Sequence, residues 1–409
     1  MKYLVLIPDG MADRPVPLLE NRTPMEAAEK PVMEALAAKA LCGTVSNVPD
    51  GMVPESDTAN LAILSYDPRT YSKGRSPLEA MSLGLSMEPD DTAIRCNVVT
   101  LSGSADEPYE SRTMLDHSSG DITTEESARL VAALNEALPM EGRILHTGVS
   151  YRHCLIWNGA SDTYSFDRPH DILGQCIGSH LPREEDGGGE FLRYMKEGAK
   201  VLDRHPVNRA RVARGLRPAN SPWLWSPGRK PALPSFAEKW GVRPAVISAV
   251  DLIKGIGVCA DCDVISVPGA TGNYYTNYAG KAAAAIEALK THDMAYIHVE
   301  APDECGHQGE AEQKTSSIEK IDAEILGPVL AYLKSTGERF RVLCLPDHPT
   351  PIEIRTHSRE PVPFFLYDSA QEKAGVSRFT EAECAAQNRF YPDGSASLMK
   401  LLFAADSAD

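Results

Sequence analysis

The chain has 409 residues, enough for two or three domains with a large buried core, and 43% of them are hydrophobic, an ordinary share for a globular protein. Its formal net charge of −16 argues against a nucleic-acid surface, and no lysine and arginine run is long enough to reverse that balance. An anionic substrate must therefore be held locally, by metal ions or by a few arginines.

The first predicted element is a strand at residues 3–7, YLVLI. It resembles the start of a signal peptide, but the apolar stretch is too short and leads straight into a Pro-Asp-Gly turn, so we interpret it as a core strand. No window approaches the roughly 20 apolar residues that a membrane helix needs. Nine cysteines are scattered singly through apolar runs, which favours reduced thiols over a disulfide framework. We therefore expect a soluble, cytoplasmic protein without a membrane partner.

A serine stands at the start of the next helical pattern. The stretch VPESDTANLAILSYDP, residues 53–68, places Ser56 just ahead of that pattern. A serine in this position commonly caps the helix. The same position also allows helix N–H groups to hold phosphate oxygens, so Ser56 has a second interpretation that depends on what lies nearby.

The middle of the chain has a different pattern. RILHTGVSYRHCLIWNG contains two β-type runs about a GVSY turn and predicts an antiparallel hairpin, and helical patterns occupy 123–138 and 190–203. We expect an inserted, smaller α+β domain at residues 95–235. The core domain would then consist of residues 1–94 and 236–409.

The second half of the chain alternates between short apolar runs and segments with helical spacing. The helical segments are 279–290 and 316–334. The β-type runs are 245–250, 263–267, 294–300 and 341–345. This alternation predicts an α/β fold, with a mostly parallel sheet covered by helices on both faces.

Acids and imidazoles follow three of the predicted strands. The carboxyl ends of parallel strands meet at one edge of a sheet, where ligands bind, so we expect these side chains to converge there. Asp303 and His357 are expected at a loop edge outside the core. The residues are Asp9, Asp303, His307, Asp347, His348 and His357.

Three carboxylates and three imidazoles at one edge would repel or desolvate one another unless a cation compensates them. Each residue alone is more simply a helix cap or a solvated loop residue, but the set predicts a metal cluster. Mixed aspartate and histidine ligation suits manganese or zinc better than magnesium alone. Beside such a cluster, Ser56 becomes a candidate nucleophile, because a metal-bound hydroxyl does not need a histidine base.

These motifs give the sequence a resemblance to the alkaline phosphatase superfamily. More closely, it resembles the cofactor-independent phosphoglycerate mutases of the archaeal type, together with the bacterial branch of that family described as proposed homoserine kinases. The resemblance runs nearly from end to end. It is carried by IPDGMADRP, PESDTANLAILSYDP, SSGDITTEESARLV, AVDLIKGIG, VPGATGNYYTNYAGKA, HVEAPDECGH, and LPDHPTP with RTHS and PVPF.

The resemblance implies two divalent metal ions, usually manganese, with zinc, cobalt or magnesium as alternatives. It also implies an alkaline phosphatase-like core and a phosphorylated nucleophile at Ser56. One metal would be held by Asp9, Ser56, Asp347 and His348, and the other by Asp303, His307 and His357. The substrate would be a small phosphorylated molecule, phosphoglycerate, and the inserted domain would close over it as a lid.

Four further residues are candidates for substrate contacts. Lys254, in DLIKGIG, resembles the phosphate-contacting lysine of the family and would be catalytic as well as substrate-binding; it is otherwise an exposed helix lysine. Arg95 and Arg152 have the fork geometry that matches a carboxylate, although each is equally well explained as a surface arginine. His117 is a candidate for proton transfer to the glycerate oxygens, and otherwise a solvent-facing loop histidine.

Four functions are compatible with these residues. The first is interconversion of 3- and 2-phosphoglycerate, and the second is transfer of phosphate from a nucleotide to a small amino alcohol such as homoserine, although GATGNYY lacks the Gly-Lys-Ser/Thr ending of a P-loop. The third is a phosphatase, in which water reaches the phosphoserine first. The fourth is a non-enzymatic regulator with a decayed site, against which all seven core positions carry competent residues. Sequence alone does not predict the oligomeric state.

Overall fold

The computed structural model of the chain describes residues 1–103 and 107–404. The chain forms two compact units, of which the first is built from Met1–Ser72 and Ala232–Asp409 and the second from Lys73–Pro231. In the described part of the chain, no helix combines the length and the apolar character needed to cross a membrane.

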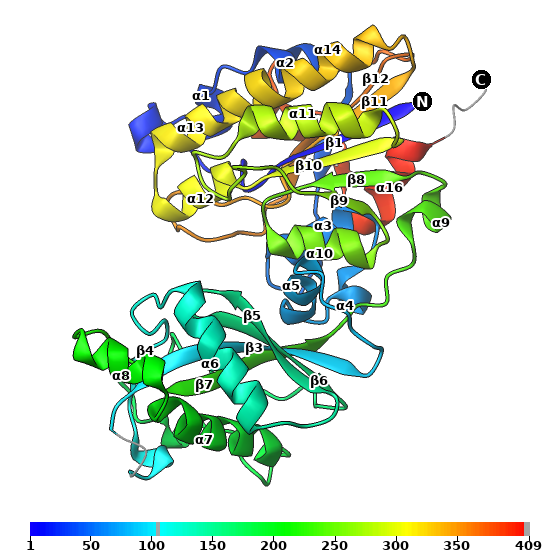
Figure 1. Ribbon diagram of the computed structural model, residues 1–409. Helices are drawn as coiled ribbons and strands as arrows, with labels where there is room; N and C mark the ends of the chain where they lie inside the picture. Colours follow the sequence, from blue (N-terminus) through cyan, green and yellow to red (C-terminus); the bar gives the residue numbers. More distant parts are fainter. Residues whose placement is uncertain (104–106, 405–409) are drawn as a thin grey trace. The chain divides into compact units, whose positions relative to one another are not determined.

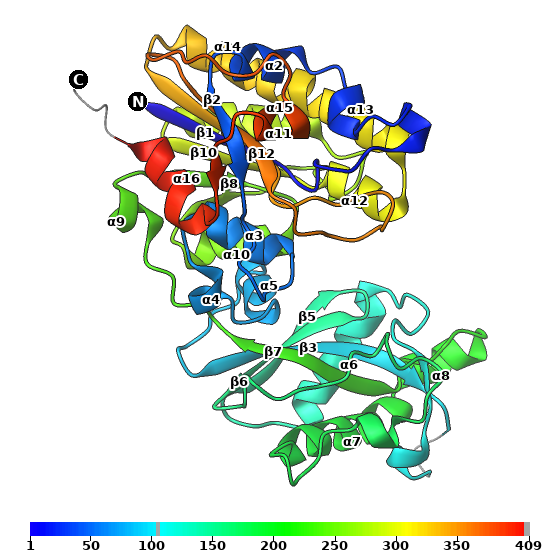
Figure 2. The same cartoon turned by 180° about the vertical axis from the view of Figure 1, so that it is seen from behind.

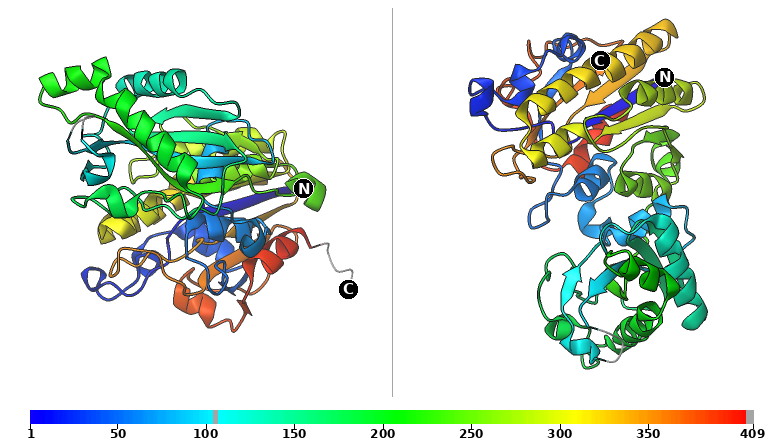
Figure 3. Two further views of the ribbon diagram at one scale, coloured as in Figure 1. Left: turned by 90° about the horizontal axis from the view of Figure 1, so that it is seen from below. Right: turned by 60° about the vertical axis from the view of Figure 1, so that its left-hand side comes forward.

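The first unit is organised around an eight-stranded sheet (Figure 1). The strands, in spatial order, are β13 (Phe390–Tyr391), β2 (Leu41–Val45), β12 (Val362–Asp368), β11 (Phe340–Cys344), β1 (Lys2–Pro8), β10 (Met294–Val299), β8 (Pro244–Ile247) and β9 (Asp263–Ile265). β12 runs antiparallel to both of its neighbours, and every other neighbouring pair is parallel. Figure 3 shows β1 in dark blue among the yellow and orange segments, so the sheet joins parts of the chain that are far apart in sequence.

Helices cover both faces of this sheet, as the opposite views of Figures 1 and 2 show. Burial on both faces explains why β1 and β10 read as continuous apolar runs rather than alternating ones. The helical segments of the unit are η1 (Pro17–Leu19), α1 (Pro24–Ala27), α2 (Pro31–Ala37), α3 (Ser56–Ile63), α4 (Pro68–Tyr71), α9 (Phe236–Trp240), α10 (Asp251–Cys259), α11 (Tyr278–Leu289), α12 (Ala301–Gln308), α13 (Ala311–Lys320), the π-helical η4 (Ile321–Leu326), α14 (Gly327–Ser335), α15 (Glu381–Ala385) and α16 (Gly394–Phe403).

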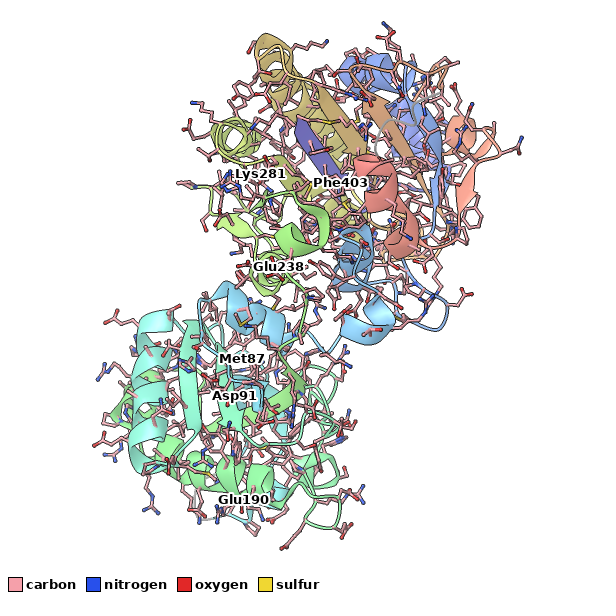
Figure 4. All side chains as sticks on the ribbon, turned by 90° about the vertical axis from the view of Figure 1, so that its right-hand side faces the viewer. Met87, Asp91, Glu190, Glu238, Lys281 and Phe403 are labelled. Atoms are coloured by element: carbon pink, nitrogen blue, oxygen red, sulfur yellow. The ribbon has the colours of Figure 1, made fainter. Side chains whose placement is uncertain are left out.

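The second unit contains a five-stranded antiparallel sheet. Its strands are β3 (Asp91–Leu101), β4 (Met114–Asp116), β5 (Arg143–Val149), β6 (Arg152–Asn158) and β7 (Ser221–Arg229). β3 is central because it pairs with β4, β6 and β7, while β5 and β6 form the predicted hairpin. Its helical segments are α5 (Ser76–Ser82), η2 (Tyr109–Ser111), α6 (Thr124–Ala137), η3 (Ile177–His180), α7 (Gly189–Asp203) and α8 (Pro206–Ala213). Figure 4 labels Met87, which lies between α5 and β3, and Asp91, the first residue of β3.

These observations confirm an α/β fold with a mostly parallel sheet and a smaller α+β insertion. The second unit begins at Lys73, earlier than the boundary at residue 95 that the sequence suggested. The reason is that α5 packs on β3 and β7: Arg95 on β3 forms a two-point ion pair with Glu79 on α5, and Ser76 donates a hydrogen bond to the Ser226 carbonyl. No apolar pattern distinguished this short helix from the core helices before it.

Candidate metal centre

Three parallel strands of the first unit, β1, β10 and β11, have their carboxyl ends at the same edge of the sheet. In the sheet register Pro8 of β1 lies beside Val299 of β10, and Leu6 lies beside Cys344 of β11. Asp9 follows directly after β1, and its backbone N–H donates to the Val299 carbonyl at 3.0 Å. The segment after β1, residues 9–16, is called the β1 loop below, and residues 345–361 after β11 are called the β11 loop. Both loops therefore start at one edge of the sheet.

Helix α12 brings two further candidate ligands to this edge. It begins immediately after β10, with only Glu300 between them, and it ends at Gly309 in the left-handed conformation. Asp303 and His307 are four residues apart and share one face of the helix, with His307 Nε2 lying 3.3 Å from Asp303 Oδ2. The expectation of a loop position outside the core is wrong for Asp303, which lies in a helix and is only 5% exposed.

His357 completes a three-residue group around Asp303. Its Nε2 lies 3.4 Å from Asp303 Oδ1 and 2.9 Å from His307 Nε2. The Nδ1 atoms lie close to backbone carbonyls: that of His307 is 3.0 Å from the Arg355 oxygen, and that of His357 is 2.6 Å from the Pro54 oxygen. A carbonyl only accepts hydrogen bonds, so each Nδ1 carries a proton and each Nε2 is directed toward Asp303. Two imidazoles and a carboxylate thus converge, as the ligands of a cation do.

A second group lies beside the first and contains Asp9, Asp347 and His348. His348 Nε2 is 3.6 Å from Asp9 Oδ1, 3.5 Å from Asp347 Oδ2 and 3.1 Å from the Ser56 hydroxyl oxygen. His348 Nδ1 lies 3.4 Å from the Thr350 hydroxyl oxygen, so this imidazole is also held from its far side. Ligand atoms of Asp303, His348 and His357 lie within 4.8 Å of one another, which places the two groups side by side.

Buried charge gives the physical test of whether these residues suit a cation. Burial and the neighbouring charges of Asp347 and Asp303 raise the pKa of Asp9 well above its usual value. Neither carboxylate oxygen of Asp9 has an aligned hydrogen-bond partner among the described residues, although both are buried. A buried carboxylate without aligned hydrogen-bond donors is costly, and a divalent cation between Asp9 and its neighbours would satisfy it. The residues present therefore fit a metal site.

Asp303 and the imidazoles of His307 and His357 shift one another's pKa values. The hydrogen bond to Asp303 raises the pKa of His307 to about 9. Burial alone would raise the pKa of Asp303, but the hydrogen bonds with His307 and His357 outweigh it and hold that pKa well below its usual value. Asp303 is therefore ionised at neutral pH and available as an anionic ligand.

Ser56 is the first residue of α3, and Glu55 occupies the N-cap position. The common capping role of a serine therefore does not apply, and the hydroxyl is directed to His348 instead. Asn60, one turn further along α3, donates to the Ser56 carbonyl at 2.8 Å and to Asp347 Oδ2 at 2.9 Å. This amide ties the start of the helix to a candidate ligand, so it positions Ser56 beside the second group.

His298 is a site residue that sequence reasoning did not identify. It is fully buried on β10, with Nε2 3.0 Å from Asp9 Oδ2 and Nδ1 3.3 Å from the Ser248 hydroxyl oxygen. Burial lowers the pKa of His298 to about 4, so the imidazole is neutral at pH 7. Asp9, His298 and Asp347 offer ligand atoms within 4.8 Å of one another. The available signal was an imidazole inside an otherwise apolar strand, next to the predicted edge.

Lys254 makes an ion pair within its own helix. It lies on α10, where its ammonium pairs with Asp251, one turn earlier, at 2.7 Å. Lys281 on α11, labelled in Figure 4, contacts one of the site residues: its ammonium donates to the His298 carbonyl at 2.8 Å. Burial lowers the pKa of Lys281 to about 8.

The other three candidates for substrate contacts belong to the second unit. The Arg95 guanidinium is paired with Glu79 and lies 4.6 Å from the centroid of the Trp225 ring, so it is committed to packing within this unit. Arg152 is exposed and its guanidinium lies 5.0 Å from the ring centroid of Tyr151. The His117 ring meets the Tyr151 ring edge-on at 5.7 Å, and its Nδ1 is buried without a hydrogen-bond partner among the described residues.

Comparisons with known proteins agree on one family. A family model described as 2,3-bisphosphoglycerate-independent phosphoglycerate mutase matches residues 37–208. The chain is 46% identical, over 99% of its own length and 100% of the relative, to a protein of that name from Methanothrix thermoacetophila. It is 44% identical to a probable 2,3-bisphosphoglycerate-independent phosphoglycerate mutase from Geobacter sulfurreducens, covering 96% of this chain and 98% of the relative.

Two solved structures are similar over nearly the whole chain. The PH0037 protein from Pyrococcus horikoshii has a TM-score of 0.80 at 28% identity, covering 98% of this chain and 96% of that one. The cofactor-independent phosphoglycerate mutase from Thermoplasma acidophilum has a TM-score of 0.69 at 27% identity, covering 98% of this chain and 99% of that one.

Proposed function

We propose that this chain interconverts 3-phosphoglycerate and 2-phosphoglycerate through a phosphoserine on Ser56. The reason is that the chain belongs to the family of 2,3-bisphosphoglycerate-independent phosphoglycerate mutases. The family resemblance expected from the motifs is confirmed by the full-length relatives. Its substrate is then a small phosphorylated acid. We place the activity in the cytoplasm, since all nine cysteines are free.

One observation carries the proposal. The Ser56 hydroxyl lies 3.1 Å from an imidazole that itself borders two buried carboxylates, and a second carboxylate–imidazole group lies alongside. We assign two divalent cations to these groups, manganese first and zinc, cobalt or magnesium as alternatives. Asp9, Ser56, Asp347 and His348 would hold one, and Asp303, His307 and His357 the other. Bound there, the cations supply neutralisation of the phosphate charge and a lower pKa for the serine hydroxyl.

The residues of the chain perform the remaining steps. The Ser56 hydroxyl gives up its proton and its oxygen attacks phosphorus in line. The phosphoester bond to the glycerate oxygen breaks, that oxygen takes up a proton, and a phosphoserine forms. The N-terminus of α3, where no side chain caps the first turn, would face the phosphate. Glycerate then presents its other hydroxyl and takes the phosphoryl group back. This return requires that water be kept out, and we propose the second unit as the lid that does so.

We propose that Arg152 and His117 of the second unit bind the substrate, because Arg152 is exposed and the Nδ1 atom of His117 has no hydrogen-bond partner among the described residues. Arg95 contributes less directly, since its guanidinium is already paired with Glu79. We keep Lys254 as a phosphate contact on the strength of the family motif alone, and its pairing with Asp251 would have to be exchanged for phosphate.

The test is an assay of the manganese-loaded protein with 3-phosphoglycerate alone and an enolase-coupled readout of 2-phosphoglycerate. We expect turnover without nucleotide, lost in Ser56→Ala and kept in Ser335→Ala. Ser335 is exposed, and among the described residues its hydroxyl donates to the Tyr332 carbonyl of its own helix. Mass spectrometry of quenched reactions should find phosphate on Ser56. Inactivity of folded, metal-loaded protein would refute the mutase assignment and direct the assay to nucleotide-dependent phosphorylation of homoserine.

A further inference from the structure

A fully buried lysine lies behind the candidate metal centre. Lys314 on α13 is 0% exposed. Its ammonium donates to Asp13 Oδ2 at 2.7 Å, to the Thr350 carbonyl at 2.8 Å and to the Ala12 carbonyl at 3.5 Å. Asp13 and Ala12 belong to the β1 loop and Thr350 belongs to the β11 loop. One ammonium group thus joins a helix to both loops.

Asp13 is held from several directions at once. Its Oδ1 accepts from the Arg14 N–H at 2.7 Å, and its two oxygens lie 3.2 and 3.3 Å from the Ile352 nitrogen in the β11 loop. Its own N–H donates to Glu381 Oε1 at 3.1 Å. The Thr350 N–H donates to the Ala12 carbonyl at 3.2 Å. The Lys314–Asp13 pair is therefore the centre of a set of contacts that closes one loop onto the other.

The same loops carry one or more candidate ligands of each metal group: Asp9, Asp347 and His348 of one, and His357 of the other. Thr350, whose carbonyl accepts from Lys314, donates its hydroxyl to Asp303 Oδ1 and lies 3.4 Å from His348 Nδ1. Asp303 belongs to one metal group and His348 to the other. Lys314 is therefore connected through Thr350 to one candidate ligand of each group.

The stability of the fold does not by itself require a buried lysine at position 314. A buried ion pair repays its desolvation only with good geometry and further hydrogen bonds, and an apolar side chain of similar volume often serves as well. Lys30, also 0% exposed, offers a comparison inside the same unit. Its ammonium donates to the Met25 carbonyl and pairs with Glu34, and neither residue belongs to the β1 or β11 loop.

We propose that Lys314 and Asp13 are positioning residues that hold the β1 and β11 loops in the one arrangement in which both metal groups form together. This inference rests on the proposed function, because it takes the acid–imidazole groups to be metal sites. It assigns the pair no contact with substrate and no proton transfer.

The experiment is calorimetric titration of the full-length chain with Mn²⁺, comparing wild type, Lys314→Met and Lys30→Met. Methionine keeps the apolar stem and removes the charge. We expect Mn²⁺ affinity to fall about 10- to 100-fold in Lys314→Met, the usual effect of losing a residue that orients metal ligands. Lys30→Met should retain wild-type affinity, because it removes a buried lysine that does not hold these loops.

Electron paramagnetic resonance of bound Mn²⁺ adds a readout that a purely structural role would leave unchanged. We expect the coupled spectrum of two neighbouring ions in wild type and Lys30→Met, and the spectrum of an isolated ion in Lys314→Met. Since Lys314→Met leaves Asp13 buried without its partner, the double variant Asp13→Asn/Lys314→Met is tested as well. It has no unpaired charge, so it should fold and still bind Mn²⁺ weakly.

The outcomes separate the two levels of inference. Wild-type affinity and spectrum in a folded Lys314→Met or double variant would overturn the positioning role and leave the proposed function intact. Failure of both variants to fold would make the pair a stability device and also overturn it. Absence of Mn²⁺ binding in wild type would overturn the metal-dependent function, and this inference with it.

Discussion

Asp303 shows how opposing effects on one carboxyl group are decided by its partners. Burial raises the pKa of an acid, whereas hydrogen bonds from imidazoles lower it. At Asp303 the bonds with His307 and His357 prevail, and the pKa lies well below its usual value. At Asp9, where burial and like charges act together, the pKa is raised instead. Asp303 is thus kept ionised by its neighbours, whereas ionisation of Asp9 would be favoured by a bound cation.

We predict that Asp303→Asn lowers the bound metal by one equivalent and abolishes turnover without unfolding the sheet. Asparagine has the same shape but no charge, so the carboxylate ligand is lost while packing is kept. Elemental analysis of the purified protein measures the metal, and we expect affinity for that ion to fall by at least about 100-fold.

Asp322→Asn is the matched control, since Asp322 is a buried acid that accepts hydrogen bonds from the N–H groups of Val32 and Met33, away from the site. Equal metal content in Asp303→Asn and Asp322→Asn would refute the assignment of Asp303 as a ligand.

At the scale of elements, the close approach of α12 to the β11 loop decides where the ligands stand. Gly306 faces the loop, and a Cβ atom there would lie 2.5 Å from the Thr350 carbonyl oxygen. Gly10 has a φ of +63°, and a Cβ there would lie 2.5 Å from the Thr350 hydroxyl oxygen. Both glycines let three segments approach more closely than any side chain allows.

We predict that Gly306→Ala destabilises the protein and weakens metal binding, although alanine is the better helix former. Helix propensity favours alanine by about 1 kcal/mol, but forcing a methyl group into a filled space typically costs about 1–3 kcal/mol. The backbone oxygen cannot rotate away, so the second effect should prevail. Urea unfolding measures the stability. Mn²⁺ titration measures the metal affinity, which should fall if α12 is displaced.

Gly327→Ala provides the control for this prediction. Gly327 is also helical, but a Cβ there would meet its nearest atom, the Asp322 carbonyl oxygen, at 3.5 Å, an ordinary contact. The propensity gain should then appear as unchanged or higher stability. Equal effects of the two substitutions would show that steric contact with Thr350 is not what keeps residue 306 small.

At the scale of the whole molecule, the chain divides the proposed tasks between two units with separate cores. All seven proposed metal ligands lie in the first unit, and Arg95, His117 and Arg152 lie in the second. The second unit has its own apolar core, which includes Trp157, Phe191 and Tyr194. Its stability can therefore be probed through residues that do not belong to the metal centre.

We predict that His153, buried on β6, makes the protein less stable at acid pH. Burial lowers the pKa of His153 to about 4, whereas an unfolded chain has a histidine pKa near 6.5. As pH falls, the unfolded state takes up the proton first, so stability is complete above about pH 6.5 and is lost toward about pH 4. The loss should reach about 3 kcal/mol, at 1.36 kcal/mol per unit of pKa difference.

His153→Gln provides the measurement. Glutamine does not titrate and offers an oxygen to the Gly148 N–H, which bonds His153 Nδ1 at 3.2 Å. The difference in unfolding free energy between wild type and variant should change with pH between about 6.5 and 4, while the other titrating groups cancel in the comparison. A difference that does not vary with pH would contradict a neutral, buried His153.

Much of the fold and of the candidate metal centre could be predicted from the sequence. Apolar runs identify the strands, and the parallel arrangement places the residues after them at one edge, so Asp9, Asp347 and His348 could be grouped without coordinates. His298 was missed because it lies within a strand, where only the sheet register shows that it faces Asp9. The pairing of Arg95 with Glu79 was missed because no apolar pattern assigns α5 to the second unit.

The sequence by itself determined the α/β class, the strand ends and the types of ligand available, because hydrophobic periodicity and local chemistry are properties of neighbouring residues. Only the tertiary structure decided which ligands meet and what supports them. Lys314 and Asp13 are 301 residues apart, and nothing in either local segment distinguishes them from surface charges. Their partnership exists because folding buries both groups in one place, where each charge is stable only in the presence of the other.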